Sequence, residues 1–121
     1  MELKSVQVIE GAPPSKSNMY KIVQFKGHAS LAKTKAMKDY EKSFYLQCNH
    51  YRNAAMKGFF ELHVNAFLPS NRQDLDNLLK ATLDCLQQCK AIENDRNCVK
   101  IIAQKFVDKV RPRIEFRILE V

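Results

Sequence analysis

The chain has 121 residues, of which 45% are hydrophobic, and this apolar content suits one packed domain covering residues 1–121. A disordered tail and a multidomain enzyme are thereby excluded. No run approaches the roughly 18 consecutive apolar residues of a membrane helix, and the start MELKSVQVIE lacks the apolar stretch of a secretory signal. We therefore expect a soluble, cytoplasmic protein with no membrane contact.

The net charge of +7 is concentrated in one part of the chain. Residues 15–57 carry nine basic and two acidic residues, whereas residues 58–121 carry ten basic and nine acidic ones. A local basic field attracts polyanions, and nucleic acid is the commonest polyanion inside cells. A solvated, solubilising face is the alternative, and composition does not separate the two.

The N-terminal half predicts a strand, a loop and a long helix. Residues 3–9 form a weak strand pattern, and residues 11–17 predict an extended loop because each proline disfavours the helical region for its predecessor. Over residues 30–56 apolar side chains recur every three or four positions. This spacing predicts an amphipathic helix that begins within residues 30–34 and stops before Gly58.

The C-terminal half predicts a strand, a second helix and two more strands. Residues 59–68 alternate between apolar and polar types, which is typical of a half-buried strand. A leucine stripe predicts a helix over about residues 74–90, and alternation resumes at residues 98–107 and 113–119. The order β-α-β-α-β-β predicts a single α/β (α+β) domain, a small mixed sheet packed against two helices.

Four cysteines carry no recognisable metal or redox motif. They are Cys48, Cys85, Cys89 and Cys98, and no two of them form a CxxC pair. A zinc ribbon and a thioredoxin-type site therefore find no support. We expect reduced and mostly buried thiols.

The most informative stretch is DLDNLLKATLD, residues 74–84. Asp74 and Asp76 fall where a loop enters the second helix, and Asp95 lies in a polar turn just before the next strand. These three acids could converge at one end of the sheet. Convergent carboxylates repel one another unless a cation lies among them, and Mg²⁺ accepts carboxylate oxygens, waters and a substrate phosphate. The pattern indicates metal-assisted attack of water on a phosphodiester.

Each acid also has a purely structural interpretation. Asp74 and Asp76 could cap the helix or complement its dipole, for up to about 1 kcal/mol. Asp76 with Lys80, and Lys80 with Asp84, could be surface ion pairs worth about 0.3 to 0.5 kcal/mol. Asp95 could be a turn residue. The joint placement of the acids beside a basic segment favours the metal site.

The segment DLDNLLKATLDCL, followed by a short loop and an Asp before a strand, resembles the signature of the RusA-type Holliday junction resolvases. These are small homodimeric endonucleases of bacteria and their prophages. The N-terminal PPS element is similar to the opening of that family, through Pro13, Pro14, Ser15, Asn18 and Tyr20. The resemblance covers nearly the whole chain in order, but only the DxDNxxK segment is specific.

The resemblance implies roles for particular residues. Asp74, Asp76 and Asp95 would be the catalytic acids that bind Mg²⁺, for which Mn²⁺ can substitute, and Lys80 would be the catalytic lysine that stabilises charge at the scissile phosphate. Asn77 and Asp84 would support them by orientation. The expected DNA-binding residues are Lys16, Lys21, Lys26, Lys33, Lys35 and Arg72.

The expected function is Mg²⁺-dependent resolution of four-way DNA junctions by paired symmetric nicks, in DNA recombination and repair. A twofold junction needs two active sites, so the resemblance also implies a homodimer whose partner is branched DNA. Two departures from the family leave the metal count and a loop geometry open: Asn94 precedes Asp95, and Lys90-Ala91 stands where a glycine often ends the helix. The alternatives are a non-catalytic basic dimer that binds DNA or RNA, and a nuclease acting on other branched DNA.

Overall fold

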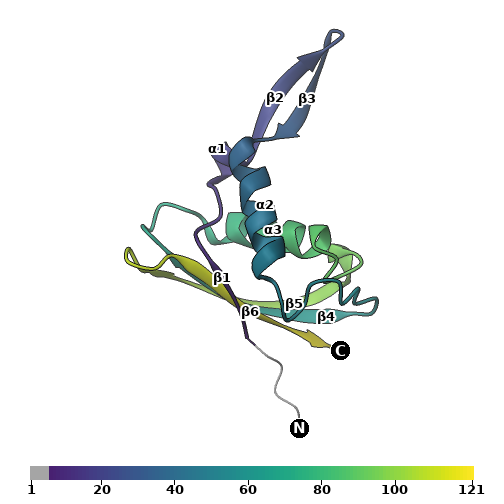
Figure 1. Cartoon of the computed structure of the whole chain (residues 1–121), viewed down its shortest axis with the longest axis vertical. Coiled ribbons are helices and arrows are strands. Elements are labelled where there is room, and N and C mark those ends of the chain that lie inside the picture. Colours follow the sequence, from purple (N-terminus) through teal and green to yellow (C-terminus); the bar gives the residue numbers. More distant parts are fainter. Residues whose placement is uncertain (1–5) are drawn as a thin grey trace.

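The computed structural model describes residues 6–121 and is built on one mixed sheet with a hairpin that projects from it (Figure 1). The strands are β1 (Gln7–Glu10), β2 (Tyr20–Phe25), β3 (His28–Lys33), β4 (Phe60–Leu68), β5 (Cys98–Val107) and β6 (Arg113–Glu120). The helices are α1 (Lys16–Met19), α2 (Lys35–Gln47), α3 (Leu75–Gln88) and the 3₁₀ turn η1 (Asp95–Asn97). The predicted fold class, a mixed sheet packed against two main helices, is confirmed.

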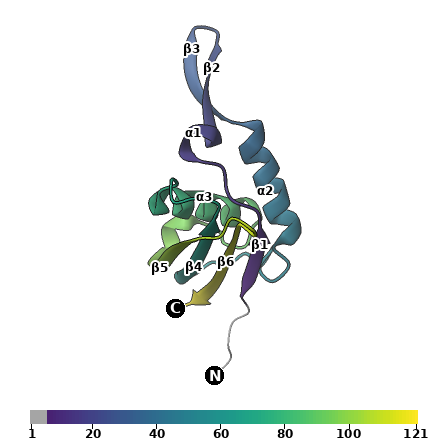
Figure 2. The same cartoon turned by 90° about the vertical axis from the view of Figure 1, so that its left-hand side faces the viewer.

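The main sheet has the order β1-β6-β4-β5, with β4 and β5 parallel and the other pairs antiparallel. Helix α3 connects the two parallel strands. Helices α2 and α3 lie on the same face of the sheet, and the other face is left uncovered (Figure 2). Strand β5 forms one edge of the sheet and β1 forms the other.

The core lies between the sheet and these helices, as the alternation of β4 predicts. Every second residue of β4 is buried: Phe60, Leu62, Val64, Ala66 and Leu68. From β6, Phe116 stacks on Phe44 of α2, with ring centroids 5.7 Å apart and planes at 11°. Offset aromatic stacking of this kind adds to the free energy gained by burial alone. Of the four cysteines, all free, only Cys98 is partly exposed.

The structure differs from the sequence-based prediction in four places. The first helix ends at Gln47, because the chain then turns and the backbone N–H groups of Asn53, Ala55 and Met56 donate to carbonyls just after α3. The apolar spacing in the sequence extends past Gln47 because Cys48 and Tyr51 are also buried, although neither belongs to the helix. Within the expected N-terminal loop, the short helix α1 begins at Lys16. The first strand is found at Gln7–Glu10, and residues 3–5 of the predicted strand lie outside the described part.

The fourth difference is the β2–β3 hairpin, which the sequence pattern did not reveal. Its two-residue turn has Lys26 at φ 50° and Gly27 at φ 80°, the left-handed values that tight hairpin turns need. Within residues 6–121, the hairpin pairs with no other strand. Because most of its side chains are exposed and only Tyr20, at its base, packs against the core, its sequence lacks the regular apolar alternation by which strands are recognised.

Candidate functional site

The two acids at the start of α3 are free to bind a ligand. Asp74 occupies the N-cap position, yet its carboxylate accepts no hydrogen bond from the first turn. Asp76 lies in that turn, and both residues are exposed. Among residues 6–121, neither carboxylate takes part in a hydrogen bond or ion pair. The capping interpretation of the Asp74 side chain is therefore not realised, and neither is an Asp76 to Lys80 ion pair.

The loop that carries Asp74 is held from two sides. The Gln73 side-chain amide donates to the carbonyl oxygens of Pro13 (3.2 Å) and Pro14 (2.9 Å). From β5, the Lys105 ammonium group donates to the Gln73 carbonyl at 3.0 Å. These bonds bring the PPS element, 60 residues away in the sequence, directly beside the DLDN segment. The two motifs that carry the family resemblance thus form one surface.

An open hollow of about 450 Å³ lies at this junction. Its lining residues are Ser15, Ser17, Arg72, Gln73, Asp74 and Asn77. Asn77 is only 8% exposed and belongs to the buried side of α3, so it lies in the wall of the hollow. The hollow thus combines one carboxylate, one guanidinium and several neutral polar groups, which suits a phosphate with a cation beside it.

One turn further along α3, Lys80 and Asp84 extend the site on the same helix face. The Lys80 ammonium lies 3.8 Å from a carboxylate oxygen of Asp84, and that oxygen also accepts a 3.1 Å hydrogen bond from the Tyr20 hydroxyl. Burial raises the pKa of the Tyr20 phenol above its usual value, and the negative charge of Asp84 raises it further. Asp84 therefore positions both Tyr20 and Lys80, while Lys80 stays 63% exposed.

Tyr20 is the site residue whose role the sequence analysis missed. The family resemblance included it only as part of the opening element. Its contact with Asp84 spans 64 residues, and no local spacing rule reports a pairing of that kind. With Lys33, Lys80 and Gln87 it lines a second open hollow of about 340 Å³.

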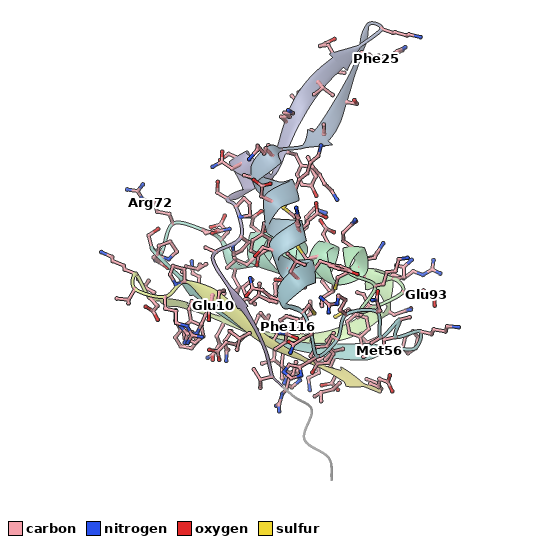
Figure 3. The ribbon with its side chains drawn as sticks, in the orientation of Figure 1. Glu10, Phe25, Met56, Arg72, Glu93 and Phe116 are labelled. Atoms are coloured by element: carbon pink, nitrogen blue, oxygen red, sulfur yellow. The ribbon has the colours of Figure 1, made fainter. Side chains whose placement is uncertain are left out.

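Asp95 does not join Asp74 and Asp76 within one chain, so the expected convergence at one end of the sheet is wrong. Because β4 and β5 are parallel, the end of β4 and the start of β5 lie at opposite ends of the sheet. Helix α3 spans the distance between them, and its 14 residues measure about 21 Å. Figure 3 shows this separation through Arg72 and Glu93, which lie two residues from Asp74 and Asp95. Within residues 6–121, no group of three metal-binding side chains occurs.

The expected DNA-binding residues are distributed over the hairpin, the start of α2 and the loop before α3. Lys21 and Lys26 are exposed on the hairpin. Lys33 is paired with Glu41 at 2.8 Å, and Lys35 with Asp39 at 3.0 Å. Arg72 is exposed at the rim of the hollow beside Asp74. The side chain of Lys16 lies outside those described.

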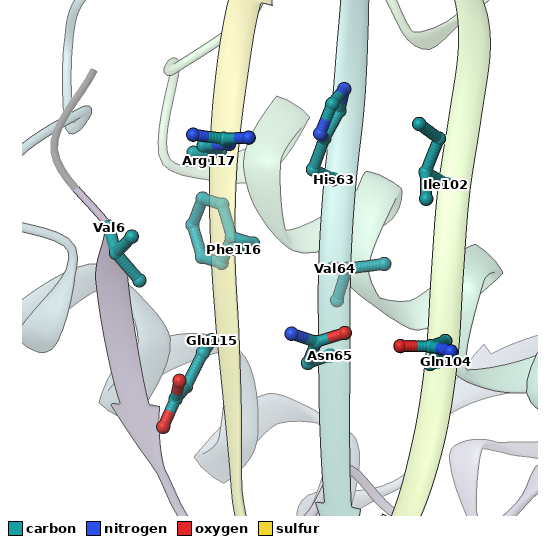
Figure 4. A pocket seen from close by; sticks show the side chains of 9 residues that line it. All are labelled: Val6, His63, Val64, Asn65, Ile102, Gln104, Glu115, Phe116 and Arg117. Carbon is teal, nitrogen blue, oxygen red and sulfur yellow. The ribbon is translucent and has the colours of Figure 1, made fainter. Parts of the chain in front are cut away.

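A further hollow, of about 350 Å³, lies on the uncovered face of the sheet (Figure 4). His63, Asn65, Gln104, Glu115 and Arg117 are among its lining residues, and the helices lie behind the sheet in this view. It contains a single carboxylate, and Glu115 is already bound to Arg113 at 2.7 Å. This surface therefore lacks the free acids that the site on α3 presents.

The fold and the site together define a small α/β protein with free carboxylates and a lysine on one helix, beside a basic hairpin. A comparison with protein-family models matches residues 10–119 to the family described as endodeoxyribonuclease RusA. The chain therefore belongs to the RusA family of nucleases, which act on Holliday junctions. No curated protein matches the chain. None of the described helices is long and apolar enough to cross a membrane.

Proposed function

We propose that this protein is a homodimeric, Mg²⁺-dependent endonuclease that resolves four-way DNA junctions by paired symmetric nicks in recombination and repair. Family membership supports nuclease activity on such junctions. The observation that carries the assignment of the site is the pair of unbonded carboxylates, Asp74 and Asp76, one turn before the exposed Lys80. Acids that served only to cap or to pair would be bonded within the chain.

The donor set fits a hard divalent cation. Asp74 and Asp76 would provide carboxylate oxygens, and Mg²⁺ in such sites keeps several waters and binds the substrate phosphate. Mn²⁺ is expected to substitute, because it also prefers oxygen ligands. When bound, the cation would lower the pKa of a coordinated water and neutralise charge on the phosphate.

The remaining groups of the site would orient the DNA and stabilise the negative charge that develops on the scissile phosphate. Lys80 would place its ammonium group against the scissile phosphate, where positive charge counters the negative charge that develops during hydrolysis. Asp84 holds Lys80 from one side and is itself held by Tyr20. Asn77 and Arg72 line the adjoining hollow, and they would position the DNA backbone next to the scissile phosphate.

A second copy of the chain would bring Asp95 to this site. Strand β5 is an edge strand of ten residues, and it exposes Val99, Ile101, Ile102, Phe106 and Val107. A long apolar edge invites pairing with another strand. Antiparallel pairing of two β5 strands about a twofold axis would set the start of one strand beside the end of the other. The partner's Asp95 would then lie at the end of the sheet where Asp74 and Asp76 lie.

The basic residues would bind the junction arms through phosphates. Lys21, Lys26 and Arg72 are exposed and unpaired among the described residues, whereas Lys33 and Lys35 already have acidic partners. Contacts of this kind position DNA without reading its sequence, so recognition should follow branch shape. If about six phosphate contacts form, affinity should fall about a thousandfold between 50 and 200 mM salt.

The test compares a synthetic four-way junction with a linear duplex of matched sequence, each incubated with Mg²⁺ or with EDTA. We expect paired nicks on the junction with Mg²⁺ and none with EDTA. Equal cutting of the linear duplex would show that the protein is a nuclease without selectivity for junctions. Binding without any Mg²⁺-dependent cleavage would overturn the proposal in favour of a non-catalytic DNA-binding dimer.

A further inference from the structure

The β2–β3 hairpin stands away from the body of the protein as an arm (Figures 1 and 2). In the described part of the chain its strands pair only with each other, from Tyr20 opposite Lys33 to Phe25 opposite His28. Six residues a strand give the arm a length of roughly 20 Å. An isolated two-stranded hairpin is at best marginally stable in water. In this protein the hairpin forms although, of its large apolar side chains, only Tyr20 at its base packs against the core.

The arm exposes three large apolar side chains. Ile22 and Leu31 face each other across the two strands and are 73% and 72% exposed. Phe25 lies at the tip and is 69% exposed (Figure 3). Single exposed apolar residues are common on protein surfaces, but these three share one projecting element. Because Phe25 is three residues from Ile22, it lies on the opposite face of the hairpin, so the arm offers apolar surface on both of its sides.

The charge of the arm restricts what that ligand is. No acidic residue occurs between Glu10 and Asp39, whereas this interval contains six lysines. At the tip, the Lys26 ammonium lies 5.5 Å from the centroid of the Phe25 ring. Lys26 also adopts a left-handed conformation that few residues other than glycine and asparagine adopt readily. The tip therefore presents an aromatic ring and a cation together, which matches the base and the phosphate of a nucleic acid.

The base of the arm is attached to the cleavage site. Tyr20, the first residue of β2, donates its hydroxyl to Asp84, and Asp84 lies beside Lys80. At the end of β3, Lys33 is ion-paired with Glu41 of α2. Ile22 and Leu31 lie on the same face of the hairpin as Tyr20 and Lys33, because they are two residues along each strand. A DNA strand bound at Lys80 would therefore have this face of the arm beside it.

We propose that the arm enters the opening at the branch point of the junction. Phe25 and the Ile22–Leu31 pair stack against the bases that border the branch, while Lys21 and Lys26 bind the flanking phosphates. Apolar wedges that unstack bases are a known way for proteins to hold DNA in a distorted form. This inference rests on the proposed function in that the ligand is a four-way junction, but it concerns binding and not cleavage.

The experiment uses full-length protein carrying Asp74→Asn, in EDTA, so that no DNA is cut. The probe is a four-way junction with 2-aminopurine beside the branch point, and a linear duplex carries the same base at its centre. The parent protein should raise the fluorescence of the junction probe because the base unstacks. Added Phe25→Ser, or Ile22→Ser with Leu31→Ser, should abolish that rise and weaken junction binding roughly 5- to 100-fold, with duplex binding changed less than about twofold.

Two control variants separate the arm from general effects. Leu46→Ser removes an apolar side chain that is 64% exposed on α2, and it should leave the fluorescence rise unchanged. Lys26→Gln should weaken binding to junction and duplex alike. It should also lower the slope of log affinity against log salt concentration by about one, the value for one lost phosphate contact. Thermal unfolding of each variant checks that the body remains folded.

The proposal is overturned if the Phe25 and Ile22/Leu31 variants bind the junction and raise its fluorescence as the parent does. It is also overturned if these variants lower the molar mass of the protein in solution, since the arm would then contact a second copy of the chain. A wild-type protein that fails to cut junctions in Mg²⁺ would refute the proposed function alone. The fluorescence of the uncut complexes would still decide the role of the arm.

Discussion

Asp74 and Asp95 lie at opposite ends of helix α3, although the proposed site requires both of them. The separation follows from the β4-α3-β5 connection, because a helix that links two parallel strands begins at one end of the sheet and returns at the other. A single chain therefore presents two acids at one end and one acid at the other. Two chains related by a twofold axis could complete both sites.

Mixing two inactive variants tests this arrangement. A homodimer of the Asp74→Asn variant should not cleave the junction, and neither should a homodimer of the Asp95→Asn variant. In a heterodimer of the two, one site carries both changes and the other carries neither, so a 1:1 mixture with free subunit exchange should regain about one quarter of the wild-type sites. Its product should be a junction nicked once. If each site is formed within one chain, every site in the mixture is damaged and activity stays absent.

A second prediction concerns the stability of α3. Because the Asp74 carboxylate makes no capping hydrogen bond, Asp74→Ala should change the free energy of unfolding by less than about 0.5 kcal/mol. The comparison is Thr34→Ala at the N-cap of α2, where the hydroxyl accepts from the Met37 N–H at 3.1 Å and also donates to the backbone carbonyls of Asn18 and Met19. This change should cost about 1 kcal/mol. Urea unfolding of both variants provides the comparison, and an equal loss for both would show that Asp74 caps its helix in solution.

Lys80 should act on the chemical step. Lys80→Gln removes the charge expected at the scissile phosphate, so kcat should fall about 10² to 10³-fold while KM for the junction changes little. Lys42→Gln, on the exposed surface of α2, removes the same charge away from the acids and should leave kcat unchanged. Single-turnover cleavage separates the two effects. A pure rise in KM for Lys80→Gln would make this lysine a binding residue.

The contact between Tyr20 and Asp84 predicts a pH dependence. Burial and the Asp84 carboxylate both raise the pKa of the Tyr20 phenol, so the neutral phenol is the form that the fold stabilises. This contribution is fully present below the usual tyrosine pKa of about 10 and is lost as the pH rises through the higher folded value. Asp84→Asn should shift the Tyr20 titration down. The measurement is ultraviolet absorbance against pH, with Tyr20→Phe identifying the signal, and an unchanged curve would refute the contact.

The edge of the sheet should determine the oligomeric state. Ile102 is 48% exposed on β5, so Ile102→Lys should leave the monomer folded but block pairing of two β5 strands. Light scattering should then report half the molar mass, and cleavage should be lost. Val110→Lys, at a position that is 94% exposed beyond the end of β5, should remain dimeric and active. A dimer that survives Ile102→Lys would place the interface elsewhere.

Local periodicity predicts the elements that pack against the core. The predicted bounds of β5, residues 98–107, agree with the structure because turn residues flank this strand. The hairpin was missed for the opposite reason. Its side chains face solvent on both sides, so neither Ile22 nor Leu31 occurs in an alternating pattern. The acids on α3 could be recognised because four-residue spacing defines a helix face. The position of Asp95 and the role of Tyr20 depend on chain crossings and long-range contacts that local spacing does not encode.

The two hydrogen bonds from Gln73 to Pro13 and Pro14 have a consequence for where a cut would fall. They fix the segment that leads into the arm to the loop that carries Asp74, while Tyr20 fixes the arm itself to α3. The base of the arm is therefore fixed relative to the acids. If the tip of the arm marks the branch point, we expect every nick to fall at the same number of nucleotides from the branch point.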